Sequence, residues 1–469
     1  MNREKQLVKN TAIIGFGTVL PKFMAVVSLP ILTAGLTKSE YGTYDLINIL
    51  ESLLLPCVTL QIQAAAFRFL IDCRDKKDRS VEIVSNVLFF TVAATATALV
   101  VLFFCLYSLS LMSRLLVCAY FMFFILKSTE QQIARGMNKP AVYSTSAVVY
   151  SAVNVLMIVI LVKFCTMGLN GALIALTAAS FVTAIMLFAR CNIAQYISLK
   201  TVSVKTIKEM LAYSWPMIPN SLSMWVMNLS DRLVLTLFLG VSVNAVYAVA
   251  NKIPSLFTIV QSTFTLAWQE SASMASSDDD AGKYYERTFD VVFCLMVGVM
   301  ALLIAATPIL FMLLIRGDYA EAYNQMPILF MGVFFSCIVA FWGGIYVAHK
   351  KTKSVGVTTT ISAAVNLIVN LLLVHSIGVY AASISTVISY VLLAVYRMYD
   401  IQKFQPMKFN ARKIFFGVAV LSVMCGLCFM QNMALNIVNM AIAIFVAIYL
   451  NKALIVKVLN KAKSMLLKH

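Results

Sequence analysis

Long apolar stretches dominate this chain of 469 residues and constrain its fold more than any other feature. A helix needs roughly 20 apolar residues to cross the hydrocarbon core of a bilayer, about 30 Å thick. Fourteen stretches approach or exceed that length: 9–33, 42–67, 83–109, 112–134, 140–162, 170–190, 210–238, 243–269, 288–315, 322–348, 354–374, 377–399, 411–430 and 433–451. Helices are expected because lipid cannot satisfy an open backbone, and the alternating segments of a barrel are absent. We predict an all-α integral membrane protein with about 14 transmembrane helices.

The distribution of positive charge gives the topology. Only 12% of the residues are charged, against about 25% in soluble domains, which excludes an ordinary cytosolic enzyme or a disordered chain. With a cytosolic N-terminus, thirty of the 37 Lys and Arg residues fall in inner links, Lys127 and Arg397 among them, and four fall in outer links. This asymmetry predicts two cytosolic termini. The net charge of +17 therefore indicates no nucleic-acid partner.

Metal and redox motifs are weak. The three histidines are scattered, and Cys425 and Cys428 form a CxxC within an apolar stretch, where small apolar side chains are the simplest interpretation. We expect no metal site, no cofactor and no catalytic residue, so the chain is not predicted to be an enzyme.

An internal repeat organises the chain. Ser151-Ala-Val-Asn154 resembles Ala363-Ala-Val-Asn366, and Tyr44 matches Tyr247, although chance similarity between apolar helices is an alternative. Six stretches separate the copies, so the repeat is parallel, about an axis along the membrane normal. The predicted parts are a six-helix bundle over 1–200, a second six-helix bundle over 201–405, and two additional helices with a basic amphipathic tail over 406–469. That tail is expected on the anionic inner leaflet.

Ionisable residues inside apolar stretches mark the candidate site, since such groups are costly in lipid. The repeat places the stretches that contain them as walls of one water-filled cavity. An anionic head group is expected to bind five residues there: Lys22, Arg232, Lys252, Asn48 and Asn251. Alternatively, Arg232 pairs with Glu51 or Asp45 and holds the halves together. Asn154, Ser362, Asn366 and Asn370 are interpreted as hydrogen-bonding seams between helices.

Several short motifs carry a family resemblance. They are Leu36-Thr-Lys-Ser-Glu-Tyr-Gly-Thr-Tyr-Asp45, Trp215-Pro216 with Pro219, Ser230-Asp231-Arg232, Tyr247-Ala-Val-Ala-Asn-Lys252, Phe264-Thr-Leu-Ala-Trp268 and Lys283-Tyr284-Tyr285. In this order they resemble the polysaccharide-transport branch of the multidrug/oligosaccharidyl-lipid/polysaccharide exporter (MOP) superfamily, which includes O-antigen and capsule repeat-unit flippases.

The resemblance implies a substrate and a mechanism. Such proteins move undecaprenyl-pyrophosphate-linked oligosaccharide from the inner to the outer leaflet of the bacterial plasma membrane, for lipopolysaccharide O-antigen or capsule. Alternating access is implied, with phospholipid around the protein and a polysaccharide polymerase and glycosyltransferases as pathway partners. Coupling to an H⁺ or Na⁺ gradient is a further hypothesis, with Asp45, Glu51 and Asp231 as the carboxylates that would bind the ion.

Other functions remain open at this point. A multidrug cation exporter of the same superfamily would favour acidic and aromatic residues in the cavity, so the three cations count against it. A peptidoglycan-precursor flippase shares the expected chemistry. A membrane-embedded glycan polymerase or acyltransferase would typically show large outer loops or a histidine within the membrane, and neither is evident.

Overall fold

The chain consists of helices joined by short links. The computed structural model describes residues 3–73, 76–276 and 278–466, and these contain helices and turns but no strand. The prediction of an all-α membrane protein is confirmed. Two compact units divide the chain, Met1–Leu229 and Ser230–His469, and each is described by itself.

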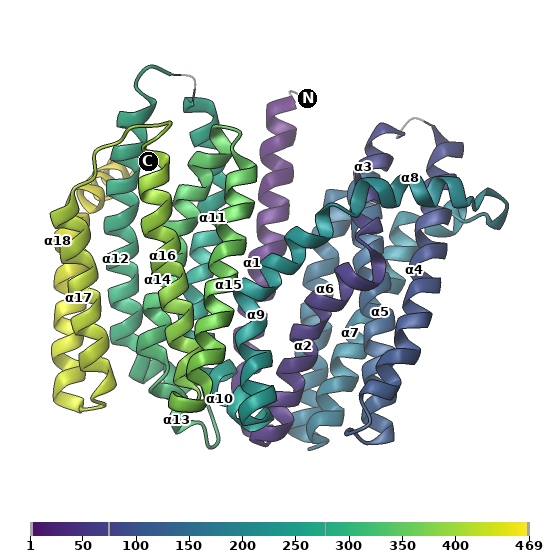
Figure 1. Cartoon of the computed structure of the whole chain (residues 1–469), viewed down its shortest axis with the longest axis horizontal. Helices are drawn as coiled ribbons and strands as arrows, with labels where there is room; N and C mark the ends of the chain where they lie inside the picture. The colour runs from purple at the N-terminus through teal and green to yellow at the C-terminus, as the bar shows by residue number, and fades with distance from the viewer. Residues whose placement is uncertain (1–2, 74–75, 277, 467–469) are drawn as a thin grey trace. The chain divides into compact units, whose positions relative to one another are not determined.

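The first unit contains eight long or medium helices and part of a ninth (Figure 1). Their bounds are α1 Arg3–Gly35, α2 Lys38–Thr59, α3 Ile62–Asp72, α4 Lys77–Cys105, α5 Leu111–Gly136, α6 Pro140–Ile158, α7 Gly168–Cys191, α8 Val204–Ser214 and α9 Met217–Leu239. A π-helical turn, Val159–Phe164, extends α6, and short 3₁₀ turns cover Ile193–Tyr196 and Leu199–Thr201. The division between the units falls inside α9.

The second unit begins within α9 and continues to the end of the chain. Its other helices are α10 Val241–Ala250, α11 Lys252–Ala275, α12 Ala281–Leu314, α13 Ala320–Tyr323, α14 Met326–Ala348, α15 Thr352–Ile377, α16 Tyr380–Ile401, α17 Ala411–Phe429 and α18 Met433–Leu466. The predicted domain boundaries, at 200/201 and 405/406, stay predictions. Most side chains of the predicted tail, 452–469, lie outside the described part.

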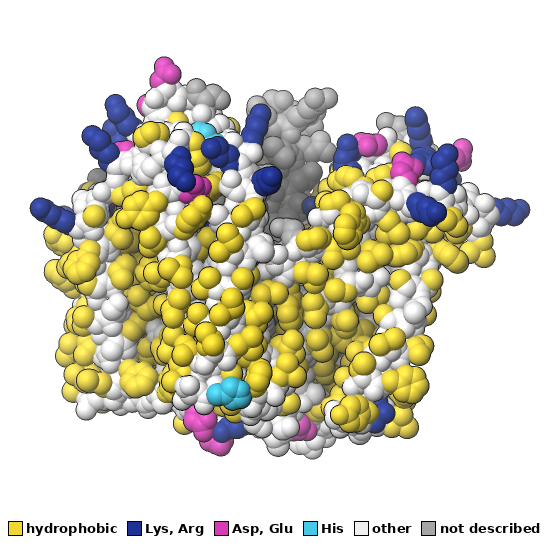
Figure 2. Space-filling model, viewed as in Figure 1, with side chains coloured by type: hydrophobic (Ala, Val, Ile, Leu, Met, Phe, Trp, Pro, Cys, Tyr) yellow, Lys and Arg dark blue, Asp and Glu magenta, His cyan; other side chains and the backbone are white. Residues whose placement is uncertain are grey.

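Membrane spans follow the apolar stretches. Among the described residues, ten helices are long and apolar enough to cross a bilayer, or eleven if α2 and α3 form one bent span. Leu20–Gly35 and Val241–Ala250 are shorter apolar helices. Figure 2 shows hydrophobic side chains along the middle of the helices, with Lys and Arg gathered mainly near one end. Every predicted stretch therefore lies on a helix or a broken pair of helices.

The α2–α3 break has an identifiable cause. Leu60 and Gln61 both have left-handed backbone angles, with φ of 47° and 61°, and the two helices diverge by 62°. Two such residues in succession cost roughly 1–3 kcal/mol each, and such strain often lies at functional sites. The Leu60 carbonyl accepts a hydrogen bond from Ser214 Oγ at 2.8 Å, and the Gln61 N–H donates to Thr59 Oγ1 at 3.3 Å. The exposed backbone groups are thereby satisfied within protein, as a membrane interior requires.

Candidate functional site

A buried carboxylate, Asp231 on α9, lies at the centre of a polar cluster in the second unit. Its side chain is 4% exposed. Oδ2 accepts hydrogen bonds from Thr386 Oγ1 at 2.6 Å and Tyr247 OH at 3.2 Å, and Oδ1 accepts one from Asn370 Nδ2 at 2.9 Å. These donors come from α16, α10 and α15, so a single carboxylate joins four helices.

Among the described residues, two asparagines of this cluster have amide oxygens without a hydrogen-bond partner. The side-chain oxygens of Asn366 and Asn370 are buried and accept no hydrogen bond, while Asn366 Nδ2 donates to Thr386 Oγ1 at 3.4 Å. Buried acceptors are normally satisfied, so two of them beside a carboxylate require an explanation. Carboxylate, amide and hydroxyl oxygens are the ligands that hard cations prefer. The set is therefore chemically suited to a bound Na⁺ or to a proton on Asp231.

The sequence had assigned these partners differently. Asn366 and Asn370 were interpreted as a helix–helix seam, and Thr386 was not considered. Asn370 does form a hydrogen bond between helices, and the structure adds that its acceptor is Asp231 on α9. The missed signal is polar spacing: Asn366 and Asn370 lie four residues apart and so face the same side of α15. Nothing in the local sequence links Thr386 to that face, because the contact spans 155 positions.

A second carboxylate, Glu51 on α2, is held within the first unit. Tyr120 OH on α5 donates a hydrogen bond to Glu51 Oε2. Lys127, two turns further along α5, interacts electrostatically with Glu51. The Lys127 ammonium also lies 3.8 Å from the centre of the Tyr150 ring and 4.6 Å from that of Phe124. Glu51 therefore has a fixed cation as its neighbour.

Two cations assigned to the inner links are in fact buried in helices. Lys127 is 6% exposed and Arg397, on α16, is 3% exposed. The Arg397 guanidinium donates to Thr358 Oγ1 at 3.0 Å, to Thr359 Oγ1 at 2.9 Å and to the carbonyls of Val339 and Val355 at 3.2 Å each. Both residues lie within the predicted apolar stretches 112–134 and 377–399, so their assignment to the links was wrong. Without these two residues, the inner links still hold far more Lys and Arg residues than the outer links.

The predicted asparagines repeat one local geometry. Asn48 Nδ2 donates to the Tyr44 carbonyl at 2.7 Å, and Asn251 Nδ2 donates to the Tyr247 carbonyl at 3.1 Å. Both bonds join residues four apart, and Tyr44 and Tyr247 are the pair matched in the internal repeat. Each amide is therefore tied to its own helix, which leaves its oxygen to face other groups.

The remaining predicted residues are divided between the units. Lys22 on α1 is half-buried and belongs to the first unit, as does the buried Asp45. Arg232 and Lys252, both half-buried, belong to the second. A shared cationic site of Lys22, Arg232 and Lys252 stays a prediction. Among the described residues, no three His, Cys, Asp or Glu side chains gather as metal ligands would.

Comparison with known proteins gives two family matches. The polysaccharide biosynthesis protein model matches residues 7–269, which is more than half of the chain, and the MatE model matches residues 216–372. No curated protein matches the chain.

Solved structures share the fold. The lipid II flippase MurJ, in an inward closed conformation, is 12% identical with a TM-score of 0.71, over 96% of this chain and 100% of that chain. An inward-facing multidrug resistance MATE transporter of the MOP superfamily is 13% identical with a TM-score of 0.66, over 88% and 95%. A MOP superfamily transporter from Pyrococcus furiosus is 14% identical with a TM-score of 0.57, over 86% and 96%.

At these sequence identities the solved structures show only the fold, and the family-model match shows the family to which the chain belongs. The resemblance found in the sequence motifs is thereby confirmed. The chain belongs to the polysaccharide biosynthesis protein family, a branch of the MOP superfamily of multi-pass membrane transporters and flippases.

Proposed function

We propose that this transporter flips undecaprenyl-pyrophosphate-linked oligosaccharide from the inner to the outer leaflet of a bacterial plasma membrane. The match to the polysaccharide biosynthesis family over residues 7–269 supports the substrate class, and the fold shared with a lipid II flippase agrees with it. We infer that both termini lie in the cytosol, from the excess of Lys and Arg in the predicted inner links. Glycosyltransferases would supply the substrate and a polymerase would consume it, toward O-antigen, capsule or a related surface polysaccharide.

We propose in addition that a Na⁺ or H⁺ gradient drives the cycle through Asp231. The supporting observation is the buried carboxylate joined to three other helices of its unit by neutral donors. A cation at this position would bind Asp231 together with the Thr386 hydroxyl oxygen, whose proton would turn to the Ala382 carbonyl at 2.9 Å, and it would compete with the Tyr247 and Asn370 donors for the carboxylate oxygens. Loading and unloading would therefore change the packing of α9, α10, α15 and α16, which is the kind of bistable contact that alternating access requires. Asp45 and Glu51 are weaker candidates for the same coupling, Glu51 because the buried Lys127 already interacts with it electrostatically.

The substrate side of the proposal uses the predicted cations. Lys22, Arg232 and Lys252 would contact the pyrophosphate, since an arginine fork and lysine point charges both suit phosphate oxygens. Asn48 and Asn251 would offer amide oxygens to sugar hydroxyl groups, because their amide nitrogens are already bonded to their own helices.

A flipping assay in vesicles tests the function and its coupling. Wild-type protein would be reconstituted with a fluorescent prenyl-pyrophosphoryl oligosaccharide, and reagent accessibility would report transfer between leaflets under Na⁺ or pH gradients. We expect transfer that one gradient accelerates and that Asp231→Asn removes, while Asp279→Asn, in an exposed loop, behaves as wild type. Absence of transfer by wild-type protein would refute the flippase. Transfer that ignores both gradients, or survives Asp231→Asn, would refute the coupling.

Multidrug export is the second candidate, and the MatE match over 216–372 favours it. Cells expressing the wild-type chain would then resist cationic dyes. We expect unchanged dye resistance and restored surface polysaccharide in a flippase-deficient strain. The opposite result would assign the chain to drug export.

A further inference from the structure

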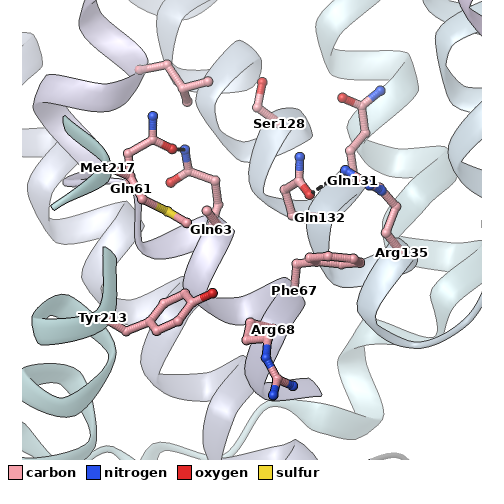
Figure 3. Close-up of a pocket in the computed structure, with 12 residues that line it drawn as sticks. Gln61, Gln63, Phe67, Arg68, Ser128, Gln131, Gln132, Arg135, Tyr213 and Met217 are labelled. Carbon is pink, nitrogen blue, oxygen red and sulfur yellow. Dashed lines mark hydrogen bonds between the residues drawn. The ribbon is translucent and has the colours of Figure 1, made fainter. Parts of the chain in front are cut away.

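A polar pocket lies inside the first unit, apart from the carboxylate clusters. Its volume is about 480 Å³, within the range of sites that bind small molecules. Four glutamines line it, two from the α2–α3 segment and two from α5, and we call it the glutamine pocket: Gln61, Gln63, Gln131, Gln132. Figure 3 shows the α3 and α5 side chains facing one another across the space. The first pair lies at and just after the break between α2 and α3 at Leu60 and Gln61.

The glutamines present unused hydrogen-bonding groups. Gln63 is 4% exposed, its Nε2 donates to Gln61 Oε1 at 3.1 Å, and its own Oε1 accepts nothing. Gln61 Nε2 is fixed by Ser221 Oγ at 2.9 Å, and Gln131 Nε2 by Ser146 Oγ at 2.9 Å. The amides are therefore held in place by neighbours outside the pocket. Gln63 lines the pocket, and its buried oxygen has no hydrogen-bond partner among the described residues, so it calls for a donor from a ligand or from water.

A guanidinium completes the pocket. Arg135 lies over the Phe67 ring at 4.6 Å and the Tyr143 ring at 5.4 Å, and its Nη1 donates to Gln132 Oε1 at 3.2 Å. Within the described residues Arg135 forms no ion pair, whereas Arg68, at the same pocket, is paired with Asp72. The two rings and Gln132 hold the guanidinium in place, and no carboxylate of the described residues forms an ion pair with it. Such a group is suited to phosphate oxygens.

The position of the pocket within the unit indicates the side of the membrane that it faces. Arg135 is the penultimate residue of α5, and Lys139 follows in the link that carries positive charge. By the positive-inside rule this end of the unit faces the cytosol. It therefore faces the leaflet in which a lipid-linked saccharide is assembled.

We propose that the glutamine pocket binds the first sugar and the adjacent phosphate of the lipid-linked saccharide at the cytosolic side. This inference rests on the proposed function. Sugar hydroxyl and amide groups both donate and accept hydrogen bonds, as glutamine amides do, so Gln63 would recognise the sugar by hydrogen bonding. Arg135 would bind the phosphate that joins the sugar to the lipid.

Binding to the full chain in nanodiscs tests this division of labour. The probes are farnesyl pyrophosphate, which lacks a sugar, and farnesyl-pyrophosphoryl-N-acetylglucosamine. We expect Gln63→Met to weaken binding of the sugar-bearing probe by about tenfold, because a buried hydrogen bond is lost, and to leave farnesyl pyrophosphate unaffected. Arg135→Gln should weaken both probes by about tenfold or more, and Arg135→Lys should recover part of the loss. The matched controls Gln195→Met and Arg190→Gln change exposed residues of the same unit and should bind both probes as wild type does.

The outcomes separate this inference from the proposed function. If wild-type protein binds and flips the lipid-linked saccharide while Gln63→Met and Arg135→Gln bind both probes normally, the pocket holds only water and the inference is wrong. If wild-type protein binds neither probe, the inference is also wrong, and the vesicle assay alone decides the function. If Gln63→Met weakens both probes equally, the assignment of the sugar to Gln63 is wrong.

Discussion

Replacing Thr386 by valine is the sharpest test of the Asp231 cluster. The substitution keeps the shape of the side chain and removes one hydroxyl, which donates to Asp231 Oδ2 at 2.6 Å and accepts from Asn366 at 3.4 Å. A hydrogen bond to a charged group is worth roughly 1.5–3 kcal/mol. If the hydroxyl and carboxylate bind Na⁺ together, the affinity should therefore fall by about tenfold to a hundredfold, at 1.4 kcal/mol per tenfold change.

The assay is the thermal stability of the purified protein as a function of salt. A ligand that binds only the folded state raises Tm with its concentration, so the midpoint of the rise reports affinity. Wild-type protein should show a midpoint in NaCl that is absent in choline chloride. The Thr386→Val variant should shift that midpoint upward, and Asp231→Asn should abolish the rise.

A matched control exists on α15. Thr360 is exposed and donates to the carbonyl of Gly356, four residues earlier, at 3.0 Å, so Thr360→Val removes a comparable hydroxyl away from the cluster. Its NaCl midpoint should equal that of wild type. An equal midpoint for Thr386→Val, or an equal rise in choline chloride, would refute Na⁺ binding at Asp231.

Three further predictions concern stability, measured as Tm in detergent. Arg397→Met should lower the free energy of unfolding by about 2–4 kcal/mol, because it strands buried acceptors on Thr358 and two carbonyls; an unchanged Tm would contradict this. Glu40→Gln should cost about 1–2 kcal/mol, since the Glu40 carboxylate accepts from both Thr37 and the Leu169 N–H, and equal stability would show that these bonds contribute little. Burial, and to a lesser extent Lys351, lower the pKa of His349 in the folded protein. The neutral imidazole therefore stabilises the fold at a pH above the pKa of the unfolded chain, and this stability is lost as the pH falls. His349→Gln should therefore reduce the loss of Tm between about pH 7 and pH 5.

The sequence predicted the membrane helices well because hydropathy and length determine spanning directly. It could not predict where a span breaks. The stretch 42–67 contains no glycine or proline at 60 or 61, yet Leu60 and Gln61 adopt left-handed angles. Ser214, 154 positions away, supplies the hydrogen bond that satisfies the break. Such a partner comes from tertiary packing, and local propensity has no information about it.

The buried charged residues were likewise predicted only in part from the sequence. Asp231 was found from sequence because an acid in an apolar stretch is unusual. Lys127 and Arg397 were misplaced because each was counted with the inner links although it lies within a predicted apolar stretch, in the last three turns of its helix. Their partners are aromatic rings in one case and threonines with carbonyls in the other. Lys127 also interacts electrostatically with Glu51, but that carboxylate lies on α2, far along the sequence from α5.

The two units then differ in a way that bears on coupling. Each has a tyrosine followed four residues later by an asparagine bonded back to it, Tyr44 with Asn48 and Tyr247 with Asn251. In the first unit Glu51 interacts electrostatically with Lys127, which is buried and lies 3.8 Å from the centre of the Tyr150 ring. In the second unit Asp231 accepts hydrogen bonds from neutral donors and has Arg232, which is half-buried, as its cationic neighbour. We therefore expect Asp231, whose cationic neighbour is the more exposed of the two, to be the carboxylate that exchanges a cation. The duplicated fold therefore leads us to expect one structural and one exchangeable position, and Lys127→Met should convert the first into the second by giving Glu51 a need for an external cation.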